Sequence, residues 1–138
     1  MKRGKKIAFV NNKGGVGKTT LTTNYGVILA KKGYKVLIID TDAQTNVIHC
    51  FGAKAKEWNA SQKQYPTLYE VTFRNANLTD AIMNVDENLR IIDCGKNWRY
   101  ADVEMMNTMI SGGSYRLFEN ILNELEKKLW LHFNWYRT

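Results

Sequence analysis

The stretch that decides the fold of this chain is Lys13-Gly14-Gly15-Val16-Gly17-Lys18-Thr19-Thr20. It follows an apolar run, Ile7–Val10, which predicts a buried strand, and it precedes residues 21–32, whose pattern predicts a helix. A glycine-rich turn between a strand and a helix N-terminus brings backbone N–H groups together, and the helix dipole favours negative charge there. The stretch therefore predicts a loop that binds phosphate.

The end of this stretch matches the P-loop pattern, in which a Gly is followed by four residues and then by Gly-Lys-Ser/Thr. In such a loop Lys18 reaches the β- and γ-phosphates of a nucleotide, and the Thr19 hydroxyl is a ligand for Mg²⁺. One position departs from the pattern, because Asn12 stands where the first Gly is expected, next to an additional lysine, Lys13. The residues expected to bind the nucleotide are Gly14, Gly15, Val16, Gly17, Lys18, Thr19 and Thr20.

The size and composition of the chain are those of one globular domain. It has 138 residues, of which 44% are hydrophobic and 24% are charged. It contains no run of about 18 apolar residues, so no transmembrane helix is expected. Cys50 and Cys94 are isolated thiols without metal-ligand spacing, as is usual in a reducing cytoplasm, and we expect a cytoplasmic protein. The net charge of +7 permits contact with nucleic acid, but the basic residues are spread along the chain.

The segment after the loop predicts a helix and a second strand. The helix should end at Gly33, a residue typical of helix C-termini. A continuous apolar run at Lys35–Asp40 then ends in a carboxylate, and such runs are typical of parallel strands that are covered on both faces. The helix face that we expect to be buried consists of Leu21, Tyr25, Ile28 and Leu29.

Further elements alternate along the rest of the chain. Thr67 and Glu70 have the spacing of a capping box at the start of a helix, and a short helix is predicted at residues 78–83. A third strand is predicted at residues 89–93, and Ser114 opens an amphipathic helix. This alternation predicts an α/β fold with three layers, in which helices cover both faces of a parallel sheet.

Two carboxylates follow the second strand, in the segment 40–46. Asp40 and Asp42 are two residues apart, so in extended chain their side chains point the same way. The carboxyl end of a strand beside the P-loop strand faces the nucleotide crevice. One carboxylate is therefore placed to hold Mg²⁺ through water, and the other to orient an attacking water.

Together these residues resemble the ParA family of partition ATPases, a branch of the P-loop proteins with a deviant Walker A motif. The Lys-Gly-Gly-x-Gly-Lys-Thr-Thr pattern of that group is matched over residues 13–20. The Asp-x-Asp-Pro-Gln-Gly-Asn motif of the partition branch is matched over residues 40–46, with Ala43 in place of Pro and Thr45 in place of Gly. The resemblance is specific over residues 7–46.

The resemblance implies a ParA-like ATP-binding protein of plasmid, phage or chromosome partition, with ATP and Mg²⁺ as cofactors. It implies an ATP-dependent homodimer or mixed dimer, hydrolysis stimulated by a ParB-like centromere-binding protein, and non-specific DNA binding. Lys13, Lys18 and Asp42 would be the catalytic residues, of which Lys13 reaches the partner's nucleotide and Asp42 positions the water. Thr19 and Asp40 would order the metal.

The same resemblance requires a Walker B strand, an apolar run that ends in Asp. Asp93 is a candidate, but alignment with the family places it in the preceding strand. Walker B would then begin after Lys128, where residues 129–138 contain no carboxylate. We therefore expect a single ParA-type domain over residues 1–138 that is incomplete at its C-terminal side, lacks most of the DNA-binding surface, and has turnover near background.

Two other classes of function stay open. One is a non-catalytic nucleotide-binding fragment that regulates a full-length relative by mixed dimerisation. The other is a MinD-like ATPase of the membrane surface, because Lys127 and Lys128 precede a tail rich in aromatic residues. The apolar residues of that tail alternate over residues 129–135, which predicts a strand rather than a membrane-binding helix, so no membrane partner is expected.

Overall fold

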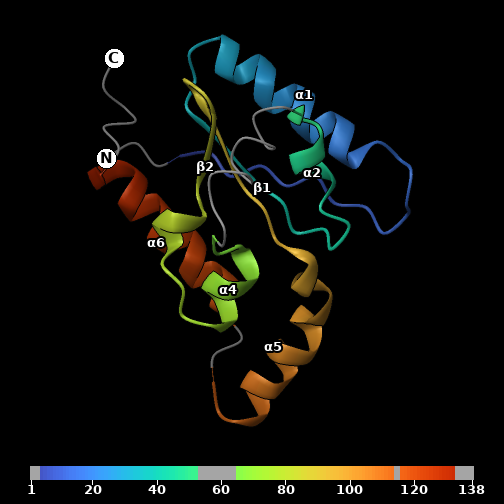
Figure 1. The fold of residues 1–138 in the computed structure, drawn as a ribbon, viewed down its shortest axis with the longest axis vertical. Coiled ribbons are helices and arrows are strands. Elements are labelled where there is room, and N and C mark those ends of the chain that lie inside the picture. The colour runs from blue at the N-terminus through green and yellow to red at the C-terminus, as the bar shows by residue number, and fades with distance from the viewer. Residues whose placement is uncertain (1–3, 53–64, 114–115, 133–138) are drawn as a thin grey trace.

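The computed structural model of the chain describes residues 4–52, 65–113 and 116–132. Its helices flank a three-stranded sheet, as Figure 1 shows. No helix in these ranges is both long enough and apolar enough to span a bilayer. In chain order the elements are α1 (Lys18–Lys31), β1 (Val36–Ile39), α2 (Asn46–His49), α4 (Leu68–Phe73), the 3₁₀ helix η1 (Leu78–Ala81), β2 (Met83–Asp86), β3 (Leu89–Ile92), the 3₁₀ helix η2 (Lys96–Tyr100), α5 (Ala101–Ile110) and α6 (Leu117–His132).

The sheet has the strand order β1-β3-β2. β1 and β3 are parallel, with Val36 opposite Leu89 and Ile39 opposite Ile92. β2 is antiparallel to β3 and is joined to it by the two residues Glu87 and Asn88. The sequence did not predict β2. A short helix was expected over residues 78–83, but the observed helix ends at Ala81, and Met83 is already the first residue of β2. The predicted α/β fold is confirmed, and β1 and β3 are parallel as expected, but the sheet as a whole is mixed because it also contains the antiparallel β2.

The apolar run of β1 is covered on both faces, as its pattern predicted. α1 and α2 lie on one side of the sheet, while α4 and α6 lie on the other (Figure 1). Ile38 belongs to the hydrophobic cluster on the side of α1 and α2, whereas Leu37 and Ile39 pack against the cluster on the opposite side. Successive side chains of a strand point to opposite faces, so a strand between two helical layers needs apolar residues at every position.

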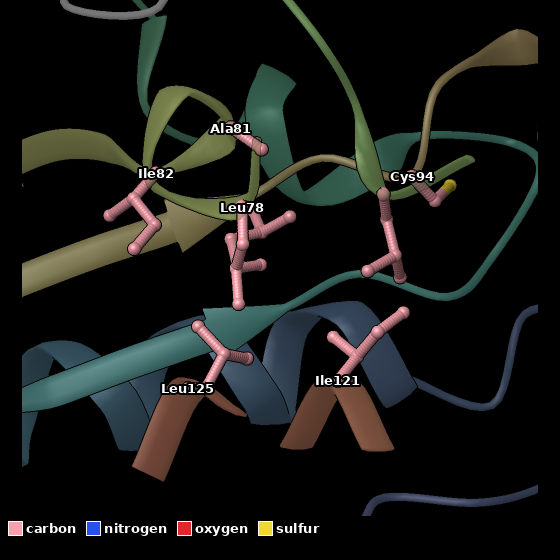
Figure 2. Packing of buried hydrophobic residues seen from close by; sticks show 8 residues of the cluster. Leu78, Ala81, Ile82, Cys94, Ile121 and Leu125 are labelled. Carbon is pink, nitrogen blue, oxygen red and sulfur yellow. The ribbon is translucent and has the colours of Figure 1, made fainter. Parts of the chain in front are cut away.

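The cluster on the side of α6 forms the second half of the core. Figure 2 shows Leu78, Cys94, Ile121 and Leu125 converging between η1, the end of β3 and α6. Ile121 and Leu125 lie one helical turn apart and are both buried, so the amphipathic helix predicted from the sequence is confirmed. Its predicted first residue, Ser114, lies outside the described residues.

The buried face of α1 differs from the prediction. Leu21, Tyr25 and Ile28 are exposed, while the buried residues of the helix are Thr23, Gly26 and Ala30. A Cβ atom added at Gly26 would lie 2.8 Å from Cδ1 of Ile38, which shows how closely the helix packs against β1. Small residues form the contact because the backbones approach each other, and the larger apolar side chains are left on the outer face.

The strand predicted at Ile7–Val10 is not formed. No strand is assigned to this segment, and Ile7 and Val10 are 55% and 84% exposed. Within the described residues β1 is an edge strand, and its one neighbour is β3. A strand is stabilised by pairing, and no partner lies beside Ile7–Val10 in the described sheet. An apolar run alone did not decide the conformation.

The strand predicted over residues 129–135 is also wrong for its first half. α6 continues to His132, so residues 129–132 are helical. Residues 133–135 lie outside the described residues. The alternation that suggested a strand follows directly on a helix that the buried Ile121 and Leu125 hold against the core, and propagation of an existing helix needs no new nucleus.

The start of α4 is fixed by the predicted capping box. The backbone N–H of Thr67 donates to Oε2 of Glu70 at 2.9 Å, and the side chain of Thr67 caps the first turn in return. The N–H of Leu68 donates to the carbonyl of Asp93 at 2.8 Å, and the Thr67 hydroxyl donates to the carbonyl of Cys94 at 3.0 Å. α4 is thereby attached to the residues that follow β3.

Candidate nucleotide-binding site

The loop before α1 has a backbone that favours glycine. Gly15 and Gly17 have φ angles of +70° and +86°, in the left-handed region that L side chains rarely adopt. No heavy atom lies within 4 Å of a Cβ placed at Gly14, Gly15 or Gly17, so the loop is open on the side where these side chains would be. The glycines therefore serve the conformation of the loop and leave its backbone accessible.

The N-terminus of α1 follows this loop directly. Gly17 is the N-cap residue, no side chain caps the helix, and the first turn contains no acidic residue. Helices begin with backbone N–H groups that have no partner within the helix, and the dipole adds partial positive charge there. This end of α1 fits an anion such as a phosphate group.

Two lysines flank the loop. The ammonium of Lys18 donates to the backbone carbonyl of Lys13 at 3.0 Å and so spans the loop from its helical end to its beginning. The N–H of Lys13 donates to Oδ1 of Asn11 at 2.8 Å, and the Lys13 side chain is exposed. A phosphate in the loop would offer Lys18 a charged acceptor in place of a neutral carbonyl.

The other predicted nucleotide-binding residues lie in the same loop and turn. Val16 is 44% exposed, Thr19 is half-buried, and Thr20 is exposed at the start of α1. The structure thus brings the predicted loop residues into one continuous surface. Neither Asp40 nor Asp42 forms an ion pair with Lys13 or Lys18 in the described part of the chain.

The two aspartates after β1 differ in environment. Asp40 is only 6% exposed, and its carboxylate accepts the backbone N–H of Asp42 at 3.0 Å and that of Val47 at 3.2 Å. Burial raises the pKa of Asp40, and these two hydrogen bonds partly offset that effect. The side chain of Asp42 is exposed, and its Oδ1 accepts the N–H of Gln44 at 3.0 Å. The same-side arrangement expected from their spacing is replaced by one buried and one exposed carboxylate.

Asp93 directly follows β3, the strand beside β1. One of its carboxylate oxygens, Oδ1, is buried without a hydrogen-bond partner in the described structure. Burial raises the pKa of Asp93, and the negative charge of Asp40 raises it further. Both edges of β3 are paired, with β1 and with β2, so no further strand of the described sheet pairs with it.

The loop and the aspartate segment carry oxygen donors of the kind that suits a magnesium ion arriving with a nucleotide. Among the residues that the structure describes, no three His, Cys, Asp or Glu side chains gather as a metal cage. Mg²⁺ is usually held by one or two carboxylates together with phosphate oxygens and waters, and not by an all-protein cage. The hydroxyl of Thr19 and the carboxylates of Asp40 and Asp42 are oxygen donors of that kind.

Two features of the aspartate loop were not foreseen. Thr45 has a φ angle of +51°, and the thiol of Cys94 donates to the carbonyl of Asp42 at 3.0 Å. The first had a signal in the sequence, because the partition motif has Gly at the position of Thr45. The second had none, because 52 residues separate Cys94 from Asp42 and only the pairing of β1 with β3 brings them together.

Comparison with known proteins places the chain in a family. Residues 4–130 match the family model described as an AAA domain. The chain is 36% identical over 107 residues to the sporulation initiation inhibitor protein Soj of Bacillus subtilis, covering 77% of this chain and 40% of that protein. It is 34% identical over 112 residues to the chromosome partitioning protein ParA of Caulobacter vibrioides, covering 80% of this chain and 39% of the relative.

Solved structures give the same result. A Cyanothece McdA variant in complex with ATP superposes with a TM-score of 0.66 at 25% identity, covering 83% of this chain and 40% of that one. A plasmid partition protein from Borrelia burgdorferi gives a TM-score of 0.67 at 26% identity, covering 84% of this chain and 48% of that one. The chain thus spans less than half the length of these relatives. With the family model matched over residues 4–130, the chain belongs to the AAA domain family and, within it, to the ParA group of P-loop ATPases.

Proposed function

We propose that this chain is a ParA-type ATP-binding protein of plasmid, phage or chromosome partition, acting in the cytoplasm with ATP and Mg²⁺. One observation carries the proposal: the positive φ angles of Gly15 and Gly17 open the loop backbone directly before the uncapped N-terminus of α1. The relatives named as partition proteins and the ATP complex of the Cyanothece relative support it.

Each site residue has a role in this proposal. Lys18 leaves the Lys13 carbonyl and binds the phosphates, while the N–H groups of the loop and of the first turn of α1 bind their oxygens. Thr19 supplies a hydroxyl to the metal. Asp42, which is exposed, orients the water that attacks the terminal phosphate. Bound Mg-ATP supplies the phosphoryl group that is transferred.

Calorimetry of Mg-ATP binding tests the site. The wild-type chain should bind, and Lys18→Ala should abolish binding because it removes the cation aimed at the phosphates. Lys31→Ala is a matched control, since Lys31 is an exposed lysine in the last turn of the same helix. Equal binding by the wild type and Lys18→Ala would contradict the assignment.

Dimerisation is the second part of the proposal. Lys13 is exposed, and the hydrogen bonds described for it involve only its backbone N–H and carbonyl groups. Its side chain can therefore reach the nucleotide of a second subunit. Lys13→Ala should keep the nucleotide affinity of the monomer and weaken the ATP-dependent dimer, as sedimentation velocity would measure. ATP-dependent binding to DNA and to a ParB-like centromere-binding protein would test the partition role itself.

A non-catalytic nucleotide-binding role is the alternative, and the position of Asp93 favours it. Because β3 is paired on both edges, with β1 and with β2, we expect Asp93 not to serve as the Walker B carboxylate. Without such a carboxylate Mg²⁺ loses an anchor, so we expect phosphate release near background. Turnover that is lost in Asp42→Ala would identify an active enzyme, and turnover that is lost in Asp93→Ala would restore Asp93 as the Walker B residue.

The MinD-like membrane role also has an observation in its favour. Residues 129–132 are helical, so the strand argument against a membrane-binding helix no longer holds there. Co-sedimentation with vesicles of acidic phospholipid tests this role. Binding that requires ATP would favour it over the partition role.

A further inference from the structure

We infer that Asp40 and Cys94 are positioning residues that hold the backbone of Asp42 from both sides, and that Asp40 acts through Asp42 instead of binding the metal itself. The inference rests on the proposed function and extends it, because the exposed Asp42 carboxylate would serve the metal of Mg-ATP in addition to orienting the attacking water. It assigns Asp40 a different role from the metal-ordering one implied by the resemblance to the ParA family.

Asp40 holds the N–H side of Asp42. Its Oδ1 accepts the N–H of Asp42 at 3.0 Å, and its Oδ2 accepts the N–H of Val47, in the first turn of α2, at 3.2 Å. Both oxygens of this buried carboxylate are therefore engaged by backbone groups. A buried carboxylate that accepts two N–H groups is stabilised in place, because losing either bond would leave a buried charge less well compensated.

Cys94 holds the carbonyl side of Asp42. Its thiol donates to that carbonyl at 3.0 Å, and the residue is fully buried. Burial raises the pKa of this thiol, and the neighbouring Asp40 and Asp93 raise it further, so the thiol keeps its proton and remains a donor. Cys94 follows β3 and Asp40 follows β1, and the N–H of Asp40 donates to the carbonyl of Ile92 at 3.0 Å.

The result is a fixed backbone with an exposed side chain. The peptide groups of Asp42 are attached to the ends of two paired strands, while its carboxylate lies at the surface with Oδ1 accepting the N–H of Gln44. Of the two aspartates, Asp42 is thus the one whose carboxylate faces outward. Fixing the backbone limits the positions of that carboxylate, and groups held in this way typically change metal affinity 10- to 100-fold when their support is removed.

A double-mutant cycle separates positioning from direct metal binding. The quantity to measure is the factor by which Mg²⁺ tightens ATP binding in calorimetry, with EDTA as the metal-free reference. Asp40→Asn should reduce this factor about 10-fold in the wild-type background. In an Asp42→Ala background the same substitution should change it by less than about 2-fold, because the residue through which Asp40 acts is gone. Equal effects in both backgrounds would overturn the inference.

The thiol provides a second and independent arm. Cys94→Ala removes the donor and should reduce the same factor, while Cys94→Ser keeps a donor and should restore most of it. Asp80→Asn, at an exposed position in η1, is the control that should leave the factor unchanged. Equal losses in Cys94→Ala and Cys94→Ser would overturn the role of the thiol bond, and this pair decides the question if Asp40→Asn does not fold.

Hydrogen exchange of the nucleotide-free chain distinguishes failure of the inference from failure of the proposed function. The amides of Asp42 and Val47 should exchange at least about 10-fold faster in Asp40→Asn than in the wild type, and at unchanged rates in Asp80→Asn. If the wild type binds no ATP, the proposed function is wrong, and unchanged exchange in Asp40→Asn shows separately that the carboxylate does not hold the loop.

Discussion

Asp40 and Asp93 directly follow two neighbouring parallel strands, and the negative charge of Asp40 raises the pKa of Asp93. Burial acts in the same direction on both carboxyl groups. The two charges remain close because the register of β1 and β3 places Ile39 opposite Ile92, immediately before each aspartate. The sheet therefore holds a like-charge pair that destabilises the fold when both groups are ionised.

Asp93→Asn should stabilise the fold at neutral pH. A carboxyl group whose pKa is raised by folding favours the folded state below its unfolded pKa, near 4, and loses that contribution as the pH rises through the raised value. The gain from Asp93→Asn should accordingly be larger at pH 7.5 than at pH 4. Urea unfolding of both proteins at the two pH values measures it, and a gain that does not depend on pH would show that charge is not the cause.

Thr45→Gly should raise the free energy of unfolding by about 0.5–1 kcal/mol. A β-branched residue with φ at +51° is strained by roughly 1–2 kcal/mol, and the greater freedom of Gly in the unfolded chain offsets part of the relief. Asn75 also has a positive φ, +55°, but Asn tolerates this region, so Asn75→Gly should change stability by less than about 0.5 kcal/mol. Urea titrations compare the two variants, and a loss of stability in Thr45→Gly would contradict the strain.

Gly95→Ala should destabilise the fold more than Gly33→Ala does. Both glycines have positive φ angles, +76° and +83°, so both substitutions introduce strain, of about 1 kcal/mol at Gly33. The strain is larger at Gly95, about 1–3 kcal/mol, because its ψ of 160° places it in a region that is almost restricted to glycine. At Gly33 the added methyl group meets no atom within 4 Å, whereas at Gly95 it would lie 2.4 Å from Oγ1 and 2.9 Å from Cβ of Thr67. We expect an additional loss of about 1–3 kcal/mol for Gly95→Ala, from disruption of the α4 cap. Thermal unfolding of both variants measures the difference.

Truncating a buried leucine of α6 and an exposed leucine of α1 compares how much each side chain contributes to stability. Leu125→Ala should cost about 2–5 kcal/mol, because Leu125 is 3% exposed within the core on the side of α6. Leu21→Ala should cost less than about 0.5 kcal/mol, because Leu21 is 55% exposed on the outer face of α1. Denaturant midpoints decide between them, and similar costs for the two variants would mean that the outer face of α1 is covered in solution.

Features that depend on local chemistry were predictable from the residue types. The helix that begins after the glycine-rich loop, its end before Gly33 and the capping box of Thr67 and Glu70 are examples. The apolar run of β1 likewise predicted a strand covered on both faces, and a third strand was predicted where β3 lies. The ParA resemblance carried by residues 13–20 and 40–46 is confirmed by the comparisons.

Other features depend on which surfaces meet, and these emerged only from the packing of the folded chain. Ile7–Val10 is as apolar as β1, yet it forms no strand because no described strand lies beside it. α1 buries Gly26 and exposes Leu21, because close approach to Ile38 matters more there than the size of the side chain. The separation of Asp40 and Asp42 into a buried and an exposed carboxylate requires Val47 and Cys94, which pairing and packing bring from 5 and 52 residues beyond Asp42. Such contacts are set by distance in space, and no local pattern in the chain encodes them.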